Sequence, residues 1–483
     1  MREAPVDDTP VNDTPAGRTR LTALIVACAL FMQNLDSSVV ATALPTMARE
    51  FGVEPVHMSL GLTAYLIALV VFVPASGWIA DRFGTRLVFR IAIGVFTIAS
   101  VLCGRADGLW ELVAARVLQG LGGAMMVPVG RLLLLRSVRK SEMVAAMAWL
   151  SMPSMIGPVI GPPLGGFFVT YLSWRWIFDI NVPIGILGIV LVTLFIEDIR
   201  EPRPQPFDVR GFLLSSVALA SLMGGLETVG RGIVAPAASW AMLGAGAAIG
   251  VIYVRHARRH PKPILDLSLL AIRSFAVSIH GGLLFRMGVG AIPFLLPLML
   301  QLGFGFSAVE SGLVTFISAC GALLMKPATQ RMLRLFGFRQ ALIWNGLVCA
   351  ALLAAMGTFR PSWPILAIYA VLLVGGLARS MQFTAYNTLA YSEIPRDRMS
   401  GATGFYSANQ QLSATLGITL GAGALEFSSW LSGHRPPSLD DFGFAFLAVA
   451  AATLLAIPAS LVLARDTGAE VSGHGRKPGE GEG

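Results

Sequence analysis

The sequence predicts an all-α polytopic membrane protein, and three observations carry that prediction: the composition, the mean hydropathy and the length of the apolar runs. Of the 483 residues, 55% are hydrophobic and 13% are charged, and the mean hydropathy is +0.69. An average soluble domain has about 25% charged residues, so this chain lacks the polar surface that a soluble enzyme needs. Its hydrophobicity also excludes disorder outside the tails.

Fourteen apolar runs are predicted to cross the bilayer, because about twenty apolar residues span the hydrocarbon core as an α-helix. The runs lack the ten-residue alternation of a membrane β-barrel. Closely spaced runs can be merged, which leaves twelve or thirteen crossings as alternatives. The fourteen runs are 21–45, 57–80, 87–104, 109–135, 143–170, 175–196, 211–229, 236–255, 274–300, 308–328, 340–358, 363–391, 400–427 and 442–464.

The runs fall into groups of six, two and six, which charged segments at 197–210 and 256–273 separate. The expected division is a disordered tail at 1–20, a six-helix bundle at 21–196, linkers with two extra central helices at 197–273, a second six-helix bundle at 274–465 and a disordered tail at 466–483.

A short internal repeat supports the idea of two related halves. Phe83-Gly84-Thr85-Arg86 follows the second run of the chain, and Phe336-Gly337-Phe338-Arg339 follows the second run of the last six. Repeated halves with a site between them are typical of secondary transporters.

The distribution of Lys and Arg predicts that both termini face the cytoplasm. With the N-terminus inside, twenty-six of the 36 Lys and Arg lie in or beside cytoplasmic segments, six lie outside and four lie within spans. Cytoplasmic loops of membrane proteins are enriched in these residues. The same distribution explains the net charge of +8 without a nucleic-acid partner.

The turn after the second run has a distinctive spacing of glycines and charges. It contains Gly77, Asp81, Arg82, Gly84 and Arg86. Gly77 permits a close helix approach and Gly84 a tight turn. Asp81 can pair with either arginine or face the N-terminus of a neighbouring helix. The simpler alternative is an ordinary charged turn.

Two charged residues within runs are candidates for function. Arg116 lies inside the fourth run, where an arginine costs roughly 2.5–3.5 kcal/mol on insertion scales, so it must face a partner or water. Asp36 lies roughly 22 Å into the first run at 1.5 Å per residue. An acid at such a depth is a candidate proton carrier. For Arg116 the alternative is a purely structural tie between helices. For Asp36 the alternative is a permanent salt bridge with an arginine.

The fifth run combines a glycine stripe with prolines. Gly157, Gly161 and Gly165 share one helix face, which permits close packing, and Pro158 and Pro162 loosen the helix. We expect a bend or pivot here, with simple packing as the alternative.

Charges and amides in other runs are candidates for a substrate cavity. Arg286 and Arg379 fall near the middle of their runs. With Arg116 they give three positive charges inside the membrane, against the one negative charge of Asp36. This balance favours anionic, zwitterionic or neutral amphiphiles, unless the arginines pair with backbone carbonyls or acids. Lys326 and Arg131 lie near run ends, where we expect them to reach the polar interface. The amide candidates, which can equally join helices, are Gln33, Asn34, Asn387 and Gln410.

Nothing in the sequence favours an enzyme. It has no phosphate-binding P-loop, and neither a nucleophile–base arrangement nor a metal-ligand cluster was recognised in it. The cysteines lie in apolar stretches without paired spacing. We therefore expect no catalysis, no cofactor and no bound metal.

These patterns, in this order, resemble the major facilitator superfamily. With the stretch from Trp174 to Pro183 and the fourteen runs, they are similar to its fourteen-helix drug:proton antiporter branch, the EmrB/QacA type. The resemblance implies two six-helix bundles that rock about a central cavity, powered by the proton gradient. Asp81 and Arg82 would latch the cytoplasmic side, Asp36 and Arg116 would take part in proton coupling, and the glycine face of the fifth run would line the bundle interface.

Two residues depart from the family pattern. Arg334 stands where the repeat would place a counterpart of Asp81, so only the first half has the full latch. Asp179 stands where the family usually has an apolar residue, and it lies near the outer end of the sixth run.

We therefore expect a proton-coupled exporter of small amphiphilic compounds in the bacterial cytoplasmic membrane. Its expected partners are a small-molecule substrate, protons and the lipid bilayer, with periplasmic or outer-membrane efflux partners left open. One alternative is an exporter of a single endogenous, for instance anionic, metabolite. An inward-running symporter and a non-transporting membrane sensor or scaffold are the others.

Overall fold

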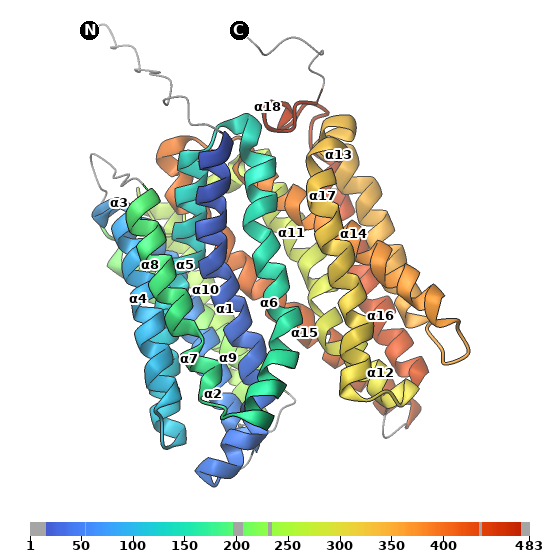
Figure 1. Cartoon of the computed structure of the whole chain (residues 1–483). Coiled ribbons are helices and arrows are strands. Elements are labelled where there is room, and N and C mark those ends of the chain that lie inside the picture. The colour runs from blue at the N-terminus through green and yellow to red at the C-terminus, as the bar shows by residue number, and fades with distance from the viewer. Residues whose placement is uncertain (1–15, 54, 197–205, 230–233, 434–436, 475–483) are drawn as a thin grey trace, which may run out of the picture.

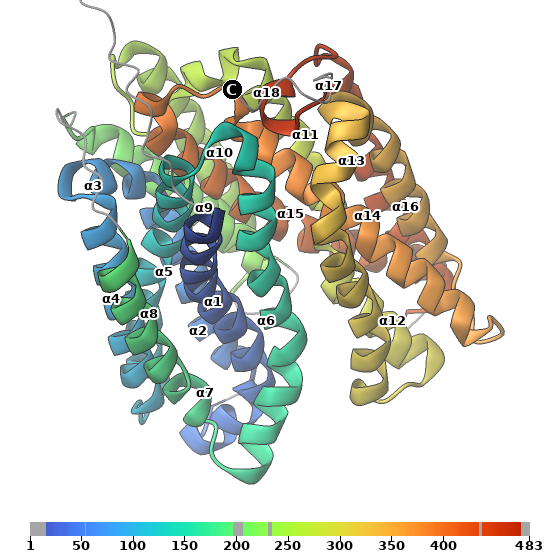
Figure 2. The ribbon, with the colours of Figure 1, turned by 45° about the horizontal axis from the view of Figure 1, so that its top comes forward.

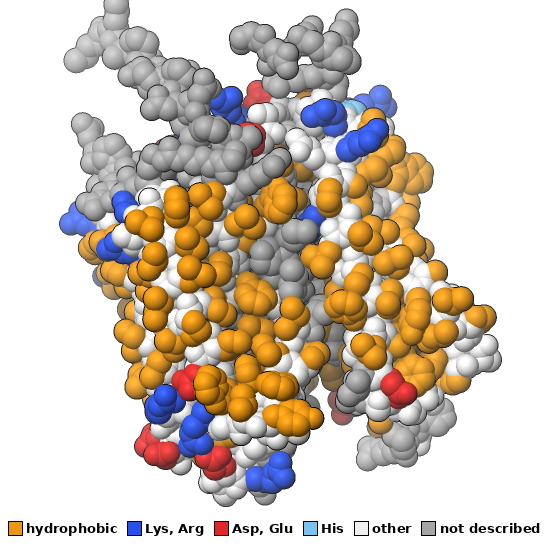
Figure 3. All heavy atoms as spheres, viewed as in Figure 1, with side chains coloured by type: hydrophobic (Ala, Val, Ile, Leu, Met, Phe, Trp, Pro, Cys, Tyr) orange, Lys and Arg blue, Asp and Glu red, His pale blue; other side chains and the backbone are white. Residues whose placement is uncertain are grey.

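The computed structural model describes residues 16–53, 55–196, 206–229, 234–433 and 437–474. Every regular element within these ranges is helical, which confirms the all-α prediction. Helices suit a chain in lipid because each satisfies its own backbone hydrogen bonds. Hydrophobic side chains cover the flanks of the molecule and charged side chains gather at its two ends (Figure 3).

The chain forms two groups of helices with a helical pair between them in sequence (Figure 1). The first group is α1 (Ala16–Phe51), α2 (Pro55–Phe72), α3 (Ser76–Phe83), α4 (Thr85–Gly104), α5 (Leu109–Ser137), α6 (Met143–Tyr171), α7 (Trp176–Asp179) and α8 (Asn181–Phe195). The pair is α9 (Val209–Thr228) and α10 (Pro236–Arg259). The second group is α11 (Arg273–Gly290), α12 (Ile292–Phe304), α13 (Ala308–Gly357), α14 (Ile365–Ser392), α15 (Met399–Ser432), α16 (Leu439–Leu454), α17 (Ile457–Leu461) and α18 (Ala469–Ser472).

Eleven stretches of the described helices are long and apolar enough to cross a membrane. One of them, Glu310–Gly357, contains two helices that meet at Gly337. Two further helices, α6 and α15, have 29 and 34 residues, or about 43 and 51 Å at 1.5 Å per residue, so they too exceed the roughly 30 Å of a hydrocarbon core. These helix lengths are compatible with fourteen membrane crossings, and that number stays a prediction.

The internal repeat corresponds to two similar backbone turns. Gly84 has φ 92° and ψ 137°, and Gly337 has φ 65° and ψ 168°. Each glycine separates two helices, and positive φ angles are accessible to glycine at little steric cost. The repeat therefore marks the same reversal of direction in each group.

We call the end of the molecule at which α1 begins the proximal face, and the opposite end the distal face. The two groups stand side by side, and α9 packs against both α2 and α15, so the helical pair contacts both groups (Figure 2). Towards the distal face the surface is hollowed between the groups (Figure 3). The polar contacts described below that join the groups lie towards the proximal face.

Helices extend into both ranges that were expected to be disordered tails, 1–20 and 466–483. Helix α1 begins at Ala16, and the predicted C-terminal tail contributes α18, whose Val471 is 1% exposed. His474 Nδ1 lies 2.8 Å from the backbone oxygen of Arg334, beside the Gly337 turn. Residues 466–474 thus pack on the proximal face, held there by Val471, by the contact of His474 with Arg334 and by Glu470, which accepts from Lys140 Nζ at 2.9 Å. The remaining tail residues, and 197–205 of the predicted linker, lie outside the described residues.

Candidate functional site

An ion pair between Asp36 and Arg116 lies inside the first group of helices. Asp36 is on α1 and Arg116 is on α5, and Arg116 Nη1 donates to Asp36 Oδ2 over 2.6 Å. The two side chains are 0% and 1% exposed, respectively. Burying two charges is unfavourable unless further hydrogen bonds satisfy the remaining polar atoms. The fold therefore brings together the two residues for which the sequence predicts proton coupling.

Three polar side chains surround this pair. Gln119 Nε2 and Asn181 Nδ2 donate to Asp36 Oδ1 over 2.9 and 3.2 Å, while Gln119 Oε1 accepts from Arg116 Nη1 over 2.6 Å. Ser100 Oγ accepts from the same two amides at 2.8 and 3.2 Å. Both carboxylate oxygens thus have donors, as a buried charge requires.

Aromatic rings shield the guanidinium of Arg116. Its Cζ lies 4.4 Å from the ring centroid of Tyr65 and 6.0 Å from that of Phe178, so both are within cation–π range. The backbone oxygen of Gly61 accepts from Arg116 Nε at 3.4 Å. Nη2 has no hydrogen-bond partner among the described residues. Helices α1, α2, α4, α5 and α8 of one group, together with α7, therefore enclose the charge.

Two of the residues predicted to form a latch, Gly77 and Asp81, lie where the two groups meet at the proximal face. Asp81 on α3 accepts from Arg136 Nη2 over 2.9 Å and also from Ser400 Oγ. Ser400 is in the first turn of α15, so Asp81 faces a helix N-terminus, where a carboxylate is stabilised. A Cβ atom on Gly77 would lie 2.5 Å from the backbone oxygen of Ser400. Of the partners considered for Asp81, the neighbouring helix N-terminus is therefore the observed one.

The other latch residues lie within the first group. Arg86 Nη2 donates to the backbone oxygen of Thr193 on α8, Arg82 is exposed, and Gly84 forms the turn between α3 and α4. The contact between the groups at this point therefore involves Gly77 and Asp81.

The glycine stripe of α6 packs against α1, within the same group. Cβ atoms on Gly161 and Gly165 would lie 2.0 Å from Ser38 Oγ and 2.1 Å from Thr42 Oγ1, and one on Gly157 would lie 2.9 Å from the backbone nitrogen of Leu35. The expectation that this face lines the interface between bundles is thus wrong, because the missing side chains admit α1 instead. The side chains of Pro158 and Pro162 lie outside the described residues.

A second polar cluster spans the two groups around Arg131. This α5 residue is 5% exposed, and it donates to Gln410 Oε1 over 2.8 Å and to the hydroxyl of Tyr391 over 3.2 Å. Gln410 Nε2 in turn donates to Asn387 Oδ1 over 3.3 Å. Arg131 therefore does not reach the interface with the lipid headgroups as predicted, because α14 and α15 cover it.

Arg286 adjoins this cluster through a shared aromatic ring. The centroid of Tyr406 lies 4.9 Å from Arg286 Cζ and 5.4 Å from Arg131 Cζ. Arg286 Nη2 donates to the Tyr406 hydroxyl, whereas its Nε and Nη1 have no hydrogen-bond partners among the described residues. Two cations from opposite groups of helices thus share one ring.

The remaining cavity candidates lie elsewhere. Gln33 is 9% exposed and lies near Gly123, and Asn34 donates to the backbone oxygen of Leu30 in its own helix. Arg379 donates to Ser318 Oγ within the second group. The structure therefore unites Asn387, Gln410 and Arg286 around Arg131, but it does not bring Gln33, Asn34 or Arg379 into the same cluster.

Lys326 also joins the two groups. It lies on α13, is 5% exposed, and donates to Ser151 Oγ on α6 over 2.7 Å and to Thr384 Oγ1 on α14 over 3.1 Å. The prediction that its ammonium group reaches the membrane surface is thus wrong, because α6 and α14 cover it. The positional cue, nearness to the end of a run, does not reveal such covering.

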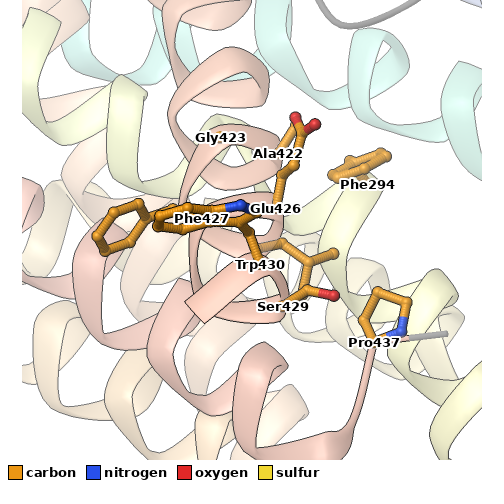
Figure 4. Close-up of a pocket in the computed structure, with 9 residues that line it drawn as sticks. Phe294, Ala422, Gly423, Glu426, Phe427, Ser429, Trp430 and Pro437 are labelled. Atoms are coloured by element: carbon orange, nitrogen blue, oxygen red, sulfur yellow. The ribbon is translucent and has the colours of Figure 1, made fainter. Parts of the chain in front are cut away.

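The distal side of the second group carries a pocket of about 780 Å³. Its lining includes Phe294 of α12 and Glu426, Phe427 and Trp430 of α15 (Figure 4). Glu426 is exposed, as expected for a residue near the end of a run. Asp179, also predicted near an outer end, accepts from Arg105 Nη1 at 3.2 Å.

Sequence reasoning did not single out two residues that complete the cluster around Asp36 and Arg116. Gln119 and Asn181 escaped notice because single amides in apolar runs are common. Both occur in stretches that the family resemblance had already singled out, and Gln119 follows Arg116 by three positions, which places both on one helix face. That spacing is the signal that would have found it.

The fold and these buried charges define a polytopic membrane transporter, not an enzyme. The chain belongs to the Major Facilitator Superfamily, whose model matches residues 26–418. It is 40% identical over 396 residues to a protein of Pectobacterium carotovorum subsp. carotovorum that is provisionally named multidrug resistance protein MdtD, covering 82% of this chain and 85% of the relative. The MdtD of Cronobacter sakazakii is 38% identical over 443 residues, covering 91% and 93%.

Two solved structures share the fold. The human organic anion transporter MFSD10 superposes with a TM-score of 0.67 at 15% identity, over 92% of this chain and all of that one. The proton:xylose symporter XylE superposes with a TM-score of 0.62 at 15% identity, over 92% of this chain and 95% of its own. At this identity the likeness concerns the fold alone.

Proposed function

We propose that this protein is a proton-coupled secondary transporter that exports small amphiphilic compounds, drugs or toxic metabolites, by alternating access. The observation that carries the proposal is the buried pair of Asp36 and Arg116. An ionisable group inside a membrane span is unfavourable and is usually retained for function. The names of the MdtD relatives support multidrug export.

In this proposal Asp36 is the group that carries the proton. A proton on the carboxyl group removes the negative charge that Arg116 contacts over 2.6 Å. The arginine would then be left as a buried, unpaired cation, which is strongly unfavourable. Binding of a proton and rearrangement of α1 against α5 are thereby linked, because each changes the free energy of the other.

Alternating access would involve separation of the two groups at the proximal face. The contact between Asp81 and Ser400 would act as the latch, with Arg82 beside it on the surface. The close packing of Gly157, Gly161 and Gly165 on α1 would let α1 and α6 move as one unit, with Pro158 and Pro162 permitting α6 to bend. The described state, with these proximal contacts made and a distal hollow, would correspond to the outward-open state.

The proposal includes a topology and a location. We assign fourteen crossings, six-helix bundles at 21–196 and 274–465, and cytoplasmic linkers with the two extra helices at 197–273. The excess of Lys and Arg in the segments on the proximal side supports a cytoplasmic location for both termini in this proposal. The location is the bacterial inner membrane, as fits the relatives. No cofactor is required, and periplasmic or outer-membrane partners stay open.

Everted membrane vesicles test the proposal directly. Respiration acidifies their lumen, so a proton antiporter should release protons from the lumen when a substrate is added outside. A symporter that runs inward in the cell would move substrate out of the vesicles together with protons, so the proton gradient would oppose uptake of the added substrate. A sensor or scaffold would give no flux. A response that a protonophore leaves unchanged would contradict proton coupling.

A second candidate function, export of an anionic metabolite, is favoured by the cations around Tyr406. Among the described residues, no carboxylate lies within ion-pair distance of Arg131, Arg286 or Lys326. Buried cations without acids attract negative charge in a low-dielectric site. This favours anionic over cationic amphiphiles as substrates.

The charge of the substrate can be tested with matched arginine variants. We expect Arg131→Gln and Arg286→Gln to reduce transport of an anionic amphiphile more than that of a neutral one. Arg360→Gln, at the distal surface beside Asp440, serves as the control. A lipophilic cation that is the best substrate, with affinity unaffected by Arg286→Gln, would contradict the anion preference.

A further inference from the structure

A cluster of two histidines and one aspartate lies at the proximal base of the α9–α10 pair. His256 is in the last turn of α10, His260 directly follows that helix, and Asp208 directly precedes α9. One potential ligand atom of each residue lies within 4.8 Å of the other two. None of these residues belongs to the proton-coupling pair, the latch or the Arg131 cluster.

We propose that Asp208, His256 and His260 form a binding site for a divalent transition-metal ion, with Zn²⁺ as the best match. Two imidazoles and a carboxylate, with water as a fourth ligand, are a common zinc ligand set. Ligands of this kind also suit Co²⁺ and Ni²⁺, whereas Mg²⁺ and Ca²⁺ prefer oxygen ligands.

The distances within the cluster suit a metal between its members. His256 Nε2 lies 3.0 Å from Asp208 Oδ1 and 3.1 Å from Oδ2. A zinc ion about 2.0–2.2 Å from a nitrogen and an oxygen holds those two atoms roughly 3 Å apart. The rings of His256 and His260 stack at 5.2 Å between centroids. His260 thus contributes a ligand nitrogen within 4.8 Å of the ligand atoms of Asp208 and His256.

Asp208 is held in place as a ligand by neighbouring backbone groups. It is 6% exposed, and its carboxylate accepts from the backbone N–H of Gly211 at 2.8 Å and of Ile264 at 3.4 Å. These backbone contacts orient the carboxylate, as second contacts of a metal ligand usually do.

The surrounding charge does not oppose binding strongly. The nearby cations Arg210, Arg258 and Arg259 are all exposed, so solvent and salt screen their repulsion. Imidazole is a neutral ligand in its unprotonated form, and Asp208 supplies the negative charge.

A bound ion would fasten the helical pair to the segment that leads into the second group. His260 begins this segment, and two further contacts hold it: Leu265 with the Tyr253 hydroxyl at 2.9 Å, and Asp266 with Arg398 at 2.6 Å. Since Arg398 directly precedes α15, the metal would stiffen the path from α10 to the helix that carries Ser400 and Tyr406.

Co²⁺ titration of the full-length protein tests the site, because four-coordinate Co²⁺ has strong visible ligand-field bands. The affinity tag is removed first and the protein is stripped of metal with a chelator. We expect one equivalent of Co²⁺ to bind, Zn²⁺ to displace it, and the melting temperature to rise with either metal. His260→Ala and Asp208→Asn should abolish the bands, while Asp208→Asn retains a side chain that can cap α9.

His280→Ala is the matched control, because His280 is exposed on α11 and its one hydrogen bond within the described residues is to the backbone oxygen of Ala276 in its own helix. It should bind Co²⁺ as the unmodified protein does. The size-exclusion elution volume and the melting temperature of each metal-free variant, compared with those of the unmodified protein, establish that the variant is folded. Absence of stoichiometric Co²⁺ binding, or binding that persists in folded His260→Ala, would overturn the proposal and leave only a hydrogen bond between His256 and Asp208. This readout does not depend on transport.

Discussion

Arg116 donates to Asp36 over 2.6 Å across 80 positions of sequence, and the two side chains are 1% and 0% exposed. The pair is enclosed by one group of helices rather than by the contact between groups. A change in its charge therefore acts first on the packing of α1 against α5. Any effect on the proximal latch must pass through these helices.

Loss of Arg116 alone should destabilise the protein more than loss of the whole pair. Arg116→Gln leaves the Asp36 carboxylate without its cation, and breaking a buried pair in this way costs about 3–5 kcal/mol. We expect Asp36→Asn/Arg116→Gln to recover part of this loss, with a coupling energy of about 1–3 kcal/mol. Melting of the four proteins in detergent measures it, and strictly additive effects would contradict the coupling.

Closure of the proximal face should depend on the absence of a side chain at Gly77. In Gly77→Ala the new Cβ would lie 2.5 Å from the Ser400 backbone oxygen, so the two groups cannot approach as closely. We expect a cysteine at Asn387, in a background without native cysteines, to become more reactive from the proximal side. Gly401→Ala is the control, because its Cβ would meet nothing within 4 Å. Equal labelling of both variants would argue against the latch.

Packing of α1 on α6 should be sensitive to Gly161. An alanine there would place Cβ 2.0 Å from Ser38 Oγ and 2.7 Å from Ser38 Cβ, and such overpacking typically costs about 1–3 kcal/mol. Ser38→Gly in the same chain should restore stability. Gly166→Ala, with nothing within 4 Å of its Cβ, should melt like the parent. The prediction fails if Gly161→Ala melts as Gly166→Ala does.

Replacement of Lys326 by an apolar residue of similar length should stabilise the described state. The buried ammonium contacts only the hydroxyls of Ser151 and Thr384 among the described residues, and apolar replacement of buried charges often gains about 1–4 kcal/mol. We expect Lys326→Met to raise the melting temperature. Lys140→Met, at an exposed contact with Glu470, should have little effect. A lower melting temperature for Lys326→Met would show that its hydrogen bonds outweigh its desolvation.

The sequence predicted the helices well because a bilayer permits few alternatives. Hydropathy located the runs, and the repeat that contains Gly84 and Gly337 indicated two related halves, in which both glycines have positive φ. A salt bridge between Asp36 and an arginine was among the alternatives because a charge within a run requires a partner, but the spacing did not identify that arginine as Arg116.

Which helix faces which could not be read from spacing. The glycines of α6 share one face in any helix, but only the fold shows that Ser38 and Thr42 of α1 occupy it. Similarly, Arg131 and Lys326 are near the ends of their runs, and their burial depends on helices of the opposite group. Asp208 and His256 are 48 positions apart, so their contact depends on how α9 and α10 pair.

Proton flux in proteoliposomes tests the role of Asp36 most directly. The unmodified protein, Asp36→Asn and Asp179→Asn are each reconstituted into vesicles, on which an inside-acid pH gradient is then imposed. Asp179→Asn is the control, because it removes an acid at the distal surface. Lipophilic cations, anions and neutral amphiphiles are then added in turn. We predict substrate-triggered proton release for the unmodified protein and Asp179→Asn, and none for correctly inserted Asp36→Asn. Normal release by Asp36→Asn would contradict the assignment of Asp36 as the proton carrier.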